Sequence, residues 1–321
     1  MKKTIWLKLC IVMMFVIVVG LTACQSAEPE DEEVNDEEAE ETAENDSDEP
    51  VTFTDKAGEE ITIEEEVERI VSVIPSATEI VFAVGAGDQV VGVSEWADYP
   101  EEVFEVEETV GDMNLNIEKI VELEPDVVIA DLNNAGDLDA MRDVGLNVVT
   151  LGSQSLEEVY EDIEMVGNAT GQAEEAEEIV SNMQSQVSEV TEQVSDIPDD
   201  ERRSVWLELD SDLYSGGEGS FLHELLTLAG GENIIADEEG WPQVSEEIVL
   251  ERDPEVIITT YGYYTDDVVE SVLARDNWQS VTAVEQEEVH DIHNDIVTRP
   301  GPRLVDGLEE IATILYPEYM E

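Results

Sequence analysis

Residues 117–130, IEKIVELEPDVVIA, and residues 246–259, EEIVLERDPEVIIT, present the same order of signals in two places along the chain. In each, a helix-like segment with an acid in its first turn leads to a proline, an acid and an apolar run. A run without a polar position is typical of a parallel strand that is covered on both faces. The two stretches therefore predict two α/β units of similar design.

The similarity extends to the residues before each stretch. TEIVFAVGAGDQVVGV, residues 78–93, and SFLHELLTLAGGENIIAD, residues 220–237, both read as a helix, a glycine cap and an apolar strand. A tryptophan follows each of them. The matched positions are Trp96 with Trp241, Pro125 with Pro254, Asp126 with Glu255 and, within one residue, Glu118 with Glu247. One chain thus repeats one arrangement.

Helix and strand signals alternate along most of the chain. A hairpin is predicted at 51–63, around Lys56-Ala57-Gly58. Strands are predicted at 69–76, 89–94, 125–130, 146–151, 204–209, 232–237 and 254–259, and helices at 77–87, 117–123, 221–231 and 302–315. This order favours an α/β fold with parallel sheets and helices on both faces.

One longer helix separates the two units. Residues 171–194 contain no internal proline or glycine, and their apolar residues recur at spacings of three and four. The predicted organisation is a first lobe at 51–170, a connecting long helix at 171–197 and a second lobe at 198–321. Two such lobes are expected to enclose a ligand cleft at the carboxyl ends of their strands, where open α/β sheets bind ligands.

The N-terminus reads as an export signal. Lys2, Lys3 and Lys8 precede an apolar run at 9–21, and LTAC follows at 21–24. This segment closely resembles a bacterial lipoprotein signal peptide, residues 1–23, which implies that Cys24 carries lipid outside the cell membrane. Residues 24–50 are then an acidic, disordered tether, because they hold almost no large apolar residue. An acidic binding tail is the alternative.

The chain is strongly acidic. It has 82 Asp and Glu against 13 Lys and Arg, for a formal net charge of −69. Binding to nucleic acid or to an anionic bilayer surface is therefore not expected. The balance resembles proteins of halophilic microbes, in which salt screens the repulsion between charges.

The motifs together resemble a known family. RIVSVIPSATEIVFAVGAGDQVVGVSEWADYP, NIEKIVELEPDVVIA, the long helix, GSFLHELLTLAGGENI, WPQVSEEIVL and TRPGPR resemble substrate-binding proteins of bacterial ABC importers. The resemblance covers the chain from Val51 and points to the helical-backbone class that carries cobalamin, siderophore-bound iron and haem. WPQVS is most similar to the cobalamin binders. The implied function is capture of cobalamin or a related corrinoid for delivery to a permease, without an enzymatic activity or a cofactor.

The aromatic and charged residues of the loops are the candidate ligand contacts. Trp96 and Trp241 could pack on a large flat ligand from opposite lobes, since aromatic faces supply large contact areas. The resemblance places Asp295 and Arg299 against the ligand, where they suit the amide side chains of a corrin. A local salt bridge is the other interpretation of that pair. Tyr99 and Tyr214 are further candidates at the rim.

Glu118 and Glu247 are the candidate contacts to a permease. Each lies in the first turn of a predicted helix, one in each lobe, where the helix dipole alone favours an acid. The resemblance implies that they dock onto arginines of a dimeric ABC permease, which works with its ATPase subunits. Glu246 competes with Glu247 for this role. The binding protein itself is expected to act as a monomer.

Several alternatives remain at this point. Cobalamin binders carry another aromatic shortly before the position of Asn116, whereas this chain has VGDMNL at 110–115, which leaves a ferric siderophore or haem as the cargo. His290 and His293, in HDIHND, would serve a metal-binding or enzymatic lipoprotein, although no complete metal shell is evident. A purely structural surface protein would bind no small molecule.

Overall fold

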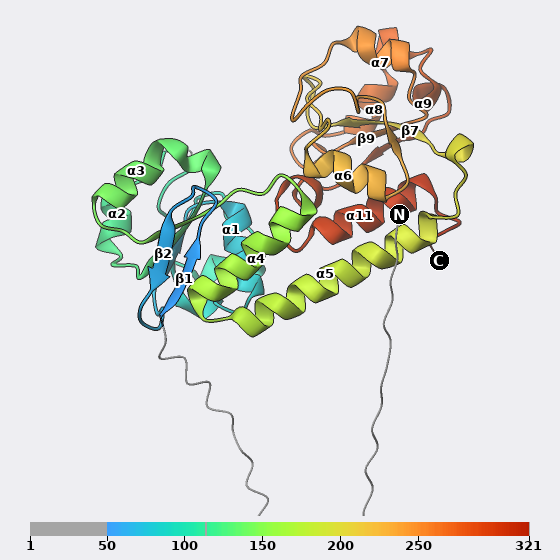
Figure 1. Cartoon of the computed structure of the whole chain (residues 1–321). Coiled ribbons are helices and arrows are strands. Elements are labelled where there is room, and N and C mark those ends of the chain that lie inside the picture. The colour runs from blue at the N-terminus through green and yellow to red at the C-terminus, as the bar shows by residue number, and fades with distance from the viewer. Residues whose placement is uncertain (1–49, 113, 321) are drawn as a thin grey trace, which may run out of the picture. The chain divides into compact units, whose positions relative to one another are not determined.

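The computed structural model describes residues 50–112 and 114–320, which form one compact unit with two parallel sheets and one hairpin. The predicted signal peptide, Cys24 and nearly all of the acidic tether lie outside these residues. The hairpin joins β1 (Val51–Thr54) to β2 (Glu60–Ile63), with Val51 opposite Ile63. Its turn uses Gly58 at φ 83°, as predicted, and β1 contacts helix α4 of the first lobe (Figure 1).

The first sheet has four parallel strands in the order β4-β3-β5-β6. They are β3 (Ile70–Ser72), β4 (Val90–Val93), β5 (Val127–Asp131) and β6 (Val148–Leu151). Residues of β3, β5 and β6 are all buried, which agrees with their apolar sequences. The helices of this lobe are α1 (Pro75–Ala83), α2 (Ile117–Glu122), α3 (Ala135–Asp143) and α4 (Leu156–Thr170), with 3-10 turns η1 (Gly87–Gln89), η2 (Glu101–Glu105) and η3 (Leu132–Asn134).

The second sheet has the order β10-β9-β7-β8, again all parallel. Its strands are β7 (Ser204–Glu208), β8 (Glu232–Asn233), β9 (Val256–Thr259) and β10 (Val289–Asp291). The helices are α6 (Phe221–Leu228), α7 (Glu246–Arg252), α8 (Val268–Leu273), α9 (Thr282–Glu285), α10 (Asp295–Thr298) and α11 (Leu304–Leu315), with 3-10 turns η4 (Asp199–Glu201) and η5 (Asp276–Trp278).

The two sheets share one topology. In each, the second strand of the lobe forms one edge, the first and third lie in the middle, and the fourth forms the other edge. Asp126 and Glu255 confirm the equivalence in detail. Each accepts hydrogen bonds through its side chain from the start of the lobe's first strand, and each backbone N–H donates 2.9 Å to a carbonyl there, of Arg69 or Ser204. The repeat read from the sequence is a structural repeat.

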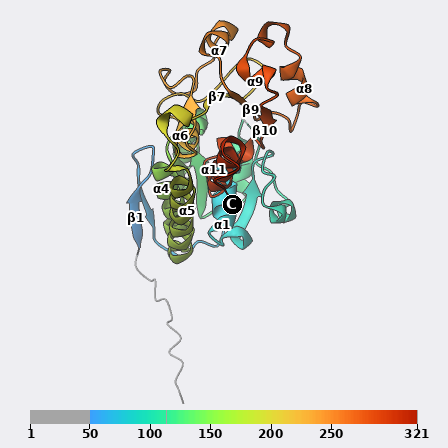
Figure 2. The same cartoon turned by 90° about the vertical axis from the view of Figure 1, so that its right-hand side faces the viewer.

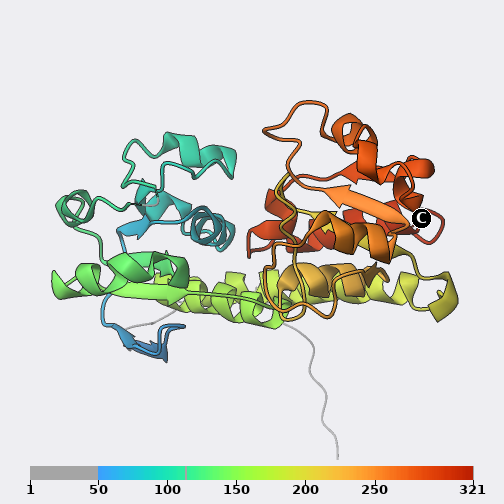
Figure 3. The ribbon, with the colours of Figure 1, turned by 90° about the horizontal axis from the view of Figure 1, so that it is seen from above.

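The long helix α5 (Ala173–Val194) connects the lobes. It follows α4 directly, because Gly171 adopts a left-handed conformation at φ 77° that ends one helix and lets the next one turn back. Its 22 residues make a rod of about 33 Å. The rod packs on α4 of the first lobe and on α6 and α11 of the second (Figures 1 and 3).

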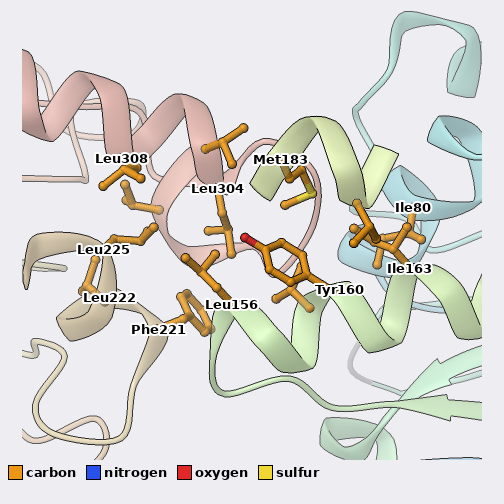
Figure 4. Packing of buried hydrophobic residues seen from close by; sticks show 14 of the residues in the cluster. Ile80, Leu156, Tyr160, Ile163, Met183, Phe221, Leu222, Leu225, Leu304 and Leu308 are labelled. Carbon is orange, nitrogen blue, oxygen red and sulfur yellow. The ribbon is translucent and has the colours of Figure 1, made fainter. Parts of the chain in front are cut away.

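The largest apolar core passes through both lobes. It includes Ile80 and Ile163 of the first lobe, Met183 of α5, and Leu225 and Leu308 of the second lobe. Figure 4 shows Leu156 and Tyr160 of α4 between these groups, beside Phe221 and Leu304. Figure 2 shows α4, α5 and α11 next to one another in the middle of the molecule, and α5 contacts both of the others. The lobes are therefore held together by packing as well as by the chain connection.

Several details differ from the sequence interpretation, including the following. The strand predicted at 232–237 is limited to Glu232–Asn233, because the Asn233 side chain accepts from Ile235 N–H and donates to Gly216 O, which turns the chain away. The long helix begins at Ala173 instead of 171. Helix α4 occupies 156–170, for which no element was predicted.

Candidate ligand and partner site

The loops predicted to line a cleft all follow the carboxyl ends of strands, at 75–76, 95–96, 131–134, 213–220, 240–241, 261–264 and 295–299. In the first lobe they follow β3, β4 and β5, and in the second lobe they follow all four strands. Two hydrogen bonds join loops at strand ends across the lobes. Arg299, after β10, donates to Asp98, after β4, and Trp241, after β8, donates to Gln154, after β6. The strand ends of both sheets thus meet, as the parallel topology predicts.

Trp96 and Tyr99 are the predicted ligand contacts of the first lobe, and both lie in the loop after β4. Trp96 is 64% exposed, and its backbone N–H donates to the hydroxyl of Ser94 at 3.2 Å. Tyr99 is half exposed, and its ring lies against the guanidinium of Arg303, 3.9 Å from ring centroid to Cζ. The indole of Trp96 therefore has a large free surface, whereas one face of Tyr99 is occupied.

Trp241 and Tyr214 are the predicted aromatic contacts of the second lobe, in the loops after β8 and β7. Trp241 is 36% exposed and packs edge-on against Phe221, with ring centroids 5.1 Å apart. Its indole N–H donates to Oε1 of Gln154, a first-lobe residue, at 3.2 Å. Tyr214 is also partly exposed and forms an isolated β-bridge with Gln243. Trp241 is thus fixed on two sides and still presents surface to solvent.

Arg299 and Asp295 are brought together, as predicted, but in a larger charged cluster. Nε of Arg299 lies 3.0 Å from Oδ1 of Asp295. Nη1 of Arg299 donates to Glu79 Oε1 at 3.0 Å and to Asp98 Oδ1 at 2.7 Å. Desolvation by burial lowers the pKa of Arg299, but the hydrogen bonds to Asp98 and Glu79 outweigh it, so the pKa is raised overall. The salt bridge between Asp295 and Arg299 is therefore present, and Nη2 of Arg299 makes no hydrogen bond within residues 50–112 and 114–320.

Sequence reasoning missed Glu79, which anchors this cluster. It lies in α1 and is 4% exposed, and it also receives hydrogen bonds from Nε and Nη2 of Arg303. The only signal was an acid within the otherwise uncharged segment PSATEIVFA, residues 75–83. In a chain with 82 acids, one more glutamate on a helix carries little information.

A cavity of about 470 Å³ lies beside this cluster. It is lined by Glu79, Tyr99 and Arg303 together with Phe82, Asp88 and Glu102 of the first lobe, among others. Of the predicted ligand contacts it includes Tyr99 alone. The cavity therefore adjoins the predicted cleft residues without containing the two tryptophans.

Glu118 and Glu247 are both exposed in the first turn of a helix, as predicted. Asn116 caps α2 by accepting from Lys119 N–H at 3.0 Å. The structure separates Glu247 from its neighbour: Glu246 accepts from Asn277 Nδ2 at 3.3 Å, whereas a hydrogen bond from Ser245 lowers the pKa of Glu247. Of the two, Glu246 is the one tied to a neighbouring element.

The histidines of 290–293 point to different partners. Nε2 of His290 lies 3.2 Å from Glu288 Oε2, and Nδ1 of His293 accepts from Asp295 N–H at 3.3 Å. Within residues 50–112 and 114–320, no group of three or more His, Cys, Asp and Glu is placed to hold a metal ion. The same residues include no helix with the length and apolarity needed to cross a membrane.

Comparison with known proteins decides the family. Residues 70–296 match the family model described as periplasmic binding protein. The chain belongs to the periplasmic binding protein family. The uncharacterized ABC transporter substrate-binding lipoprotein YvrC of Bacillus subtilis is 40% identical over 78% of this chain and 81% of its own length.

Two solved structures of the family are similar at 30% identity or above. The periplasmic vitamin B12 binding protein BtuF of Vibrio cholerae is 30% identical, covers 78% of this chain and 97% of its own, and gives a TM-score of 0.67. A possible iron-binding, periplasmic solute-binding protein of Staphylococcus epidermidis is 31% identical. The match covers 78% of this chain and 100% of that protein, with a TM-score of 0.69. The chain is a substrate-binding component of an ABC transporter and not an enzyme.

Proposed function

We propose that this periplasmic binding protein captures cobalamin or a related corrinoid and delivers it to a membrane permease. The observation that carries the proposal is the pair Trp96 and Trp241, two partly exposed indoles from opposite lobes at the carboxyl ends of the sheets. Two aromatic faces supply a large apolar contact for a macrocycle at low cost in conformational entropy. The likeness to BtuF of Vibrio cholerae supports the same ligand class.

In this proposal, Arg299 makes the polar contact with the ligand. Its Nε and Nη1 are engaged by acids, whereas Nη2 makes no hydrogen bond with any residue in the described part of the chain. The Arg299 side chain is 20% exposed, and in this proposal Nη2 donates to the amide oxygens that surround a corrin. Asp295 supports the arginine from its own lobe.

The test is a titration of the purified protein with cyanocobalamin in molar potassium chloride, followed by calorimetry and tryptophan fluorescence. We expect one saturable site with a 1:1 stoichiometry and quenching of the indoles. Haemin and a ferric hydroxamate siderophore serve as parallel ligands. Absence of cyanocobalamin binding, together with tight binding of either parallel ligand, would overturn the corrinoid proposal.

A ferric chelate is the second candidate, and one contact favours it. Tyr263 and His293 follow β9 and β10, are both more than half exposed, and have ring centroids 6.1 Å apart. A phenolate and an imidazole are both good ligands for iron. For this candidate, Tyr263→Phe should remove a phenolate-to-iron charge-transfer band from the spectrum of the iron-loaded protein. Addition of cyanocobalamin should not change the spectrum of either protein.

Delivery in this proposal uses Glu118 and Glu247 as contacts to the two halves of a permease. Each is exposed in the first turn of a helix in equivalent places of the two lobes. Symmetric acids suit a partner with two-fold symmetry and basic residues. Lipid attached to Cys24 would keep the protein at the outer face of the membrane, and Cys24→Ser should release it into the medium.

A further inference from the structure

One buried carboxylate joins the two lobes. Glu79 of α1 is 4% exposed, and its Oε1 accepts from Nη1 of Arg299 at 3.0 Å and from Nη2 of Arg303. Its Oε2 accepts from Nε of Arg303 at 2.9 Å. Arg299 and Arg303 lie at the ends of the turn between α10 and α11, in the second lobe. A single first-lobe side chain thus holds two guanidinium groups of the other lobe.

The remaining charges around the pair come from both lobes. Asp98 of the first lobe accepts from Arg299 Nη1 at 2.7 Å, and Asp295 of the second lobe lies 3.5 Å from Arg303 Nη2. The ring of Tyr99 covers Arg303. Both arginine side chains are no more than one-fifth exposed. Water therefore screens these interactions poorly, and the loss of Glu79 would leave two neighbouring guanidinium groups underpaired.

The cluster also fixes the orientation of Arg299. Contacts to Asp295, Glu79 and Asp98 hold its Nε and Nη1 edges, and a planar guanidinium held at two edges cannot rotate. The edge at Nη2 is the one without a hydrogen-bond partner among residues 50–112 and 114–320. Since Glu79 and Asp98 belong to the first lobe, the direction of this edge depends on how the lobes are spaced.

We propose that Glu79 is a positioning residue, an inter-lobe clamp that sets the spacing of the two lobes and orients the free edge of Arg299 toward a bound ligand. The orientation of Arg299 toward a ligand rests on the proposed function, because it requires a ligand with hydrogen-bond acceptors. The spacing of the lobes does not rest on the proposed function, because it is a property of the protein alone. Glu79 itself needs no contact with the ligand, since it acts through the two arginines.

The experiment compares Glu79→Gln with Asp55→Asn. Asp55 is also a buried acid paired with an arginine, because its Oδ2 accepts from Arg142 Nη2 at 3.0 Å, but both partners belong to the first lobe. Both substitutions remove one buried charge and keep the side-chain size. A general loss of stability would therefore appear in both variants, and a clamp effect in Glu79→Gln alone.

Two quantities are measured in the full-length chain with Cys10 and Cys24 replaced by serine. The first is the distance between spin labels at Asp143→Cys and Glu251→Cys, which are exposed positions in different lobes. The second is the affinity for cyanocobalamin. We expect Glu79→Gln to broaden the distance distribution and to weaken binding at least tenfold, while Asp55→Asn changes neither quantity. Glu79→Asp keeps the charge and should restore part of both.

The outcomes separate the proposals. An unchanged distance distribution in folded Glu79→Gln would overturn the clamp, and a broadened distribution with unchanged affinity would overturn the orienting role. If the unmodified protein does not bind cyanocobalamin, the corrinoid proposal fails, and the distance measurement still decides on the clamp. If Glu79→Gln does not fold, Glu79→Asp decides by the same two readouts, since a shortened acid must shift the spacing if Glu79 sets it.

Discussion

Trp241 of the second lobe donates its indole N–H to the side-chain oxygen of Gln154 in the first lobe, at 3.2 Å. Gln154 is itself held, because its amide donates to the carbonyl of Ser153 at 2.9 Å. Phe221 supports the indole from its own lobe. The ring is thus fixed by both lobes before any ligand arrives, which lowers the entropic cost of binding.

Trp241→Ala should weaken ligand binding strongly. Loss of a fixed aromatic contact at the centre of a site costs about 2 kcal/mol or more, which corresponds to roughly thirtyfold in affinity. Trp241→Phe keeps a ring but loses the bond to Gln154, so a smaller loss is expected. Calorimetric titration with cyanocobalamin measures both. Trp278→Phe is the control, since Trp278 is fully buried elsewhere in the second lobe; equal losses in it would contradict a local role of Trp241.

Reversing the charges of Glu118 and Glu247 should separate binding from transport. In the double variant Glu118→Arg with Glu247→Arg, we expect ligand affinity to stay unchanged and uptake by cells to be abolished, because like charges would then meet at the permease. Uptake of labelled ligand and calorimetry of the purified protein give the two readouts. Glu122→Arg with Glu251→Arg, two exposed acids in the same helices α2 and α7, is the matched control. Normal uptake in the first double variant would refute docking through Glu118 and Glu247.

Asp162 should make stability depend on pH below neutrality. Burial raises its pKa from 3.8 to about 6, against hydrogen bonds from Ser153 and Gly152 that lower it. The folded state therefore holds this proton more tightly than the unfolded state, and stability is lost as pH rises from about 4 to 6. The largest difference is about 3 kcal/mol.

Asp162→Asn isolates this contribution from the many other acids. The stability of the unmodified protein relative to Asp162→Asn should fall between pH 4 and pH 7 and stay level above it. Urea unfolding at a series of pH values and fixed salt measures the difference. A pH-independent difference would show that Asp162 titrates near its ordinary value.

Glu208 is predicted to be a major stabilising residue of the second lobe. It is fully buried, and its carboxylate accepts from Trp206 Nε1 at 2.9 Å, from the hydroxyl of Tyr261 and from both Nη atoms of Arg275. Glu208→Gln leaves a buried guanidinium unpaired and should cost about 3–5 kcal/mol in free energy of unfolding. Chemical denaturation measures this cost. Asp237→Asn, which breaks the exposed pair with Arg252, should change stability very little.

Salt should stabilise the folded protein. With a formal net charge of −69, repulsion between carboxylates opposes the compact state. The Debye length shrinks from about 10 Å at 0.1 M to about 3 Å at 1 M, which removes most of this repulsion. We expect Tm to rise steeply with potassium chloride up to molar concentrations. A Tm that is the same at 0.1 M and 2 M would contradict a halophilic adaptation.

The fold was predictable because its signals are local and occur twice. Residues 127–130 and 256–258 are continuous apolar runs, and each follows a proline and an acid that mark the same turn. Given two such units, the preference for right-handed crossovers leaves few arrangements of a parallel sheet. The strand at 232–237 was overestimated because the side chain of Asn233 satisfies the backbone locally, which apolar patterning does not reveal.

The charged cluster could be predicted only in part. Asp295 and Arg299 lie one helical turn apart, so their contact follows from the sequence. Glu79 and Arg299 are 220 positions apart in the sequence, and no pattern in either segment predicts that they are in contact. Such a contact depends on the relative placement of two lobes, which is set by the packing of α1, α4 and α11 around the shared core.

That shared core has a consequence for how the protein melts. Proteins made of two independent domains commonly unfold in separate steps, each with its own heat absorption. Here Ile80 and Ile163 belong to the same apolar cluster as Leu225 and Leu308, so neither sheet can lose its covering helices without exposing apolar surface of the other. Calorimetry should therefore record one cooperative transition in which both sheets are lost together. A truncation that removes α11 should melt the first lobe as well as the second.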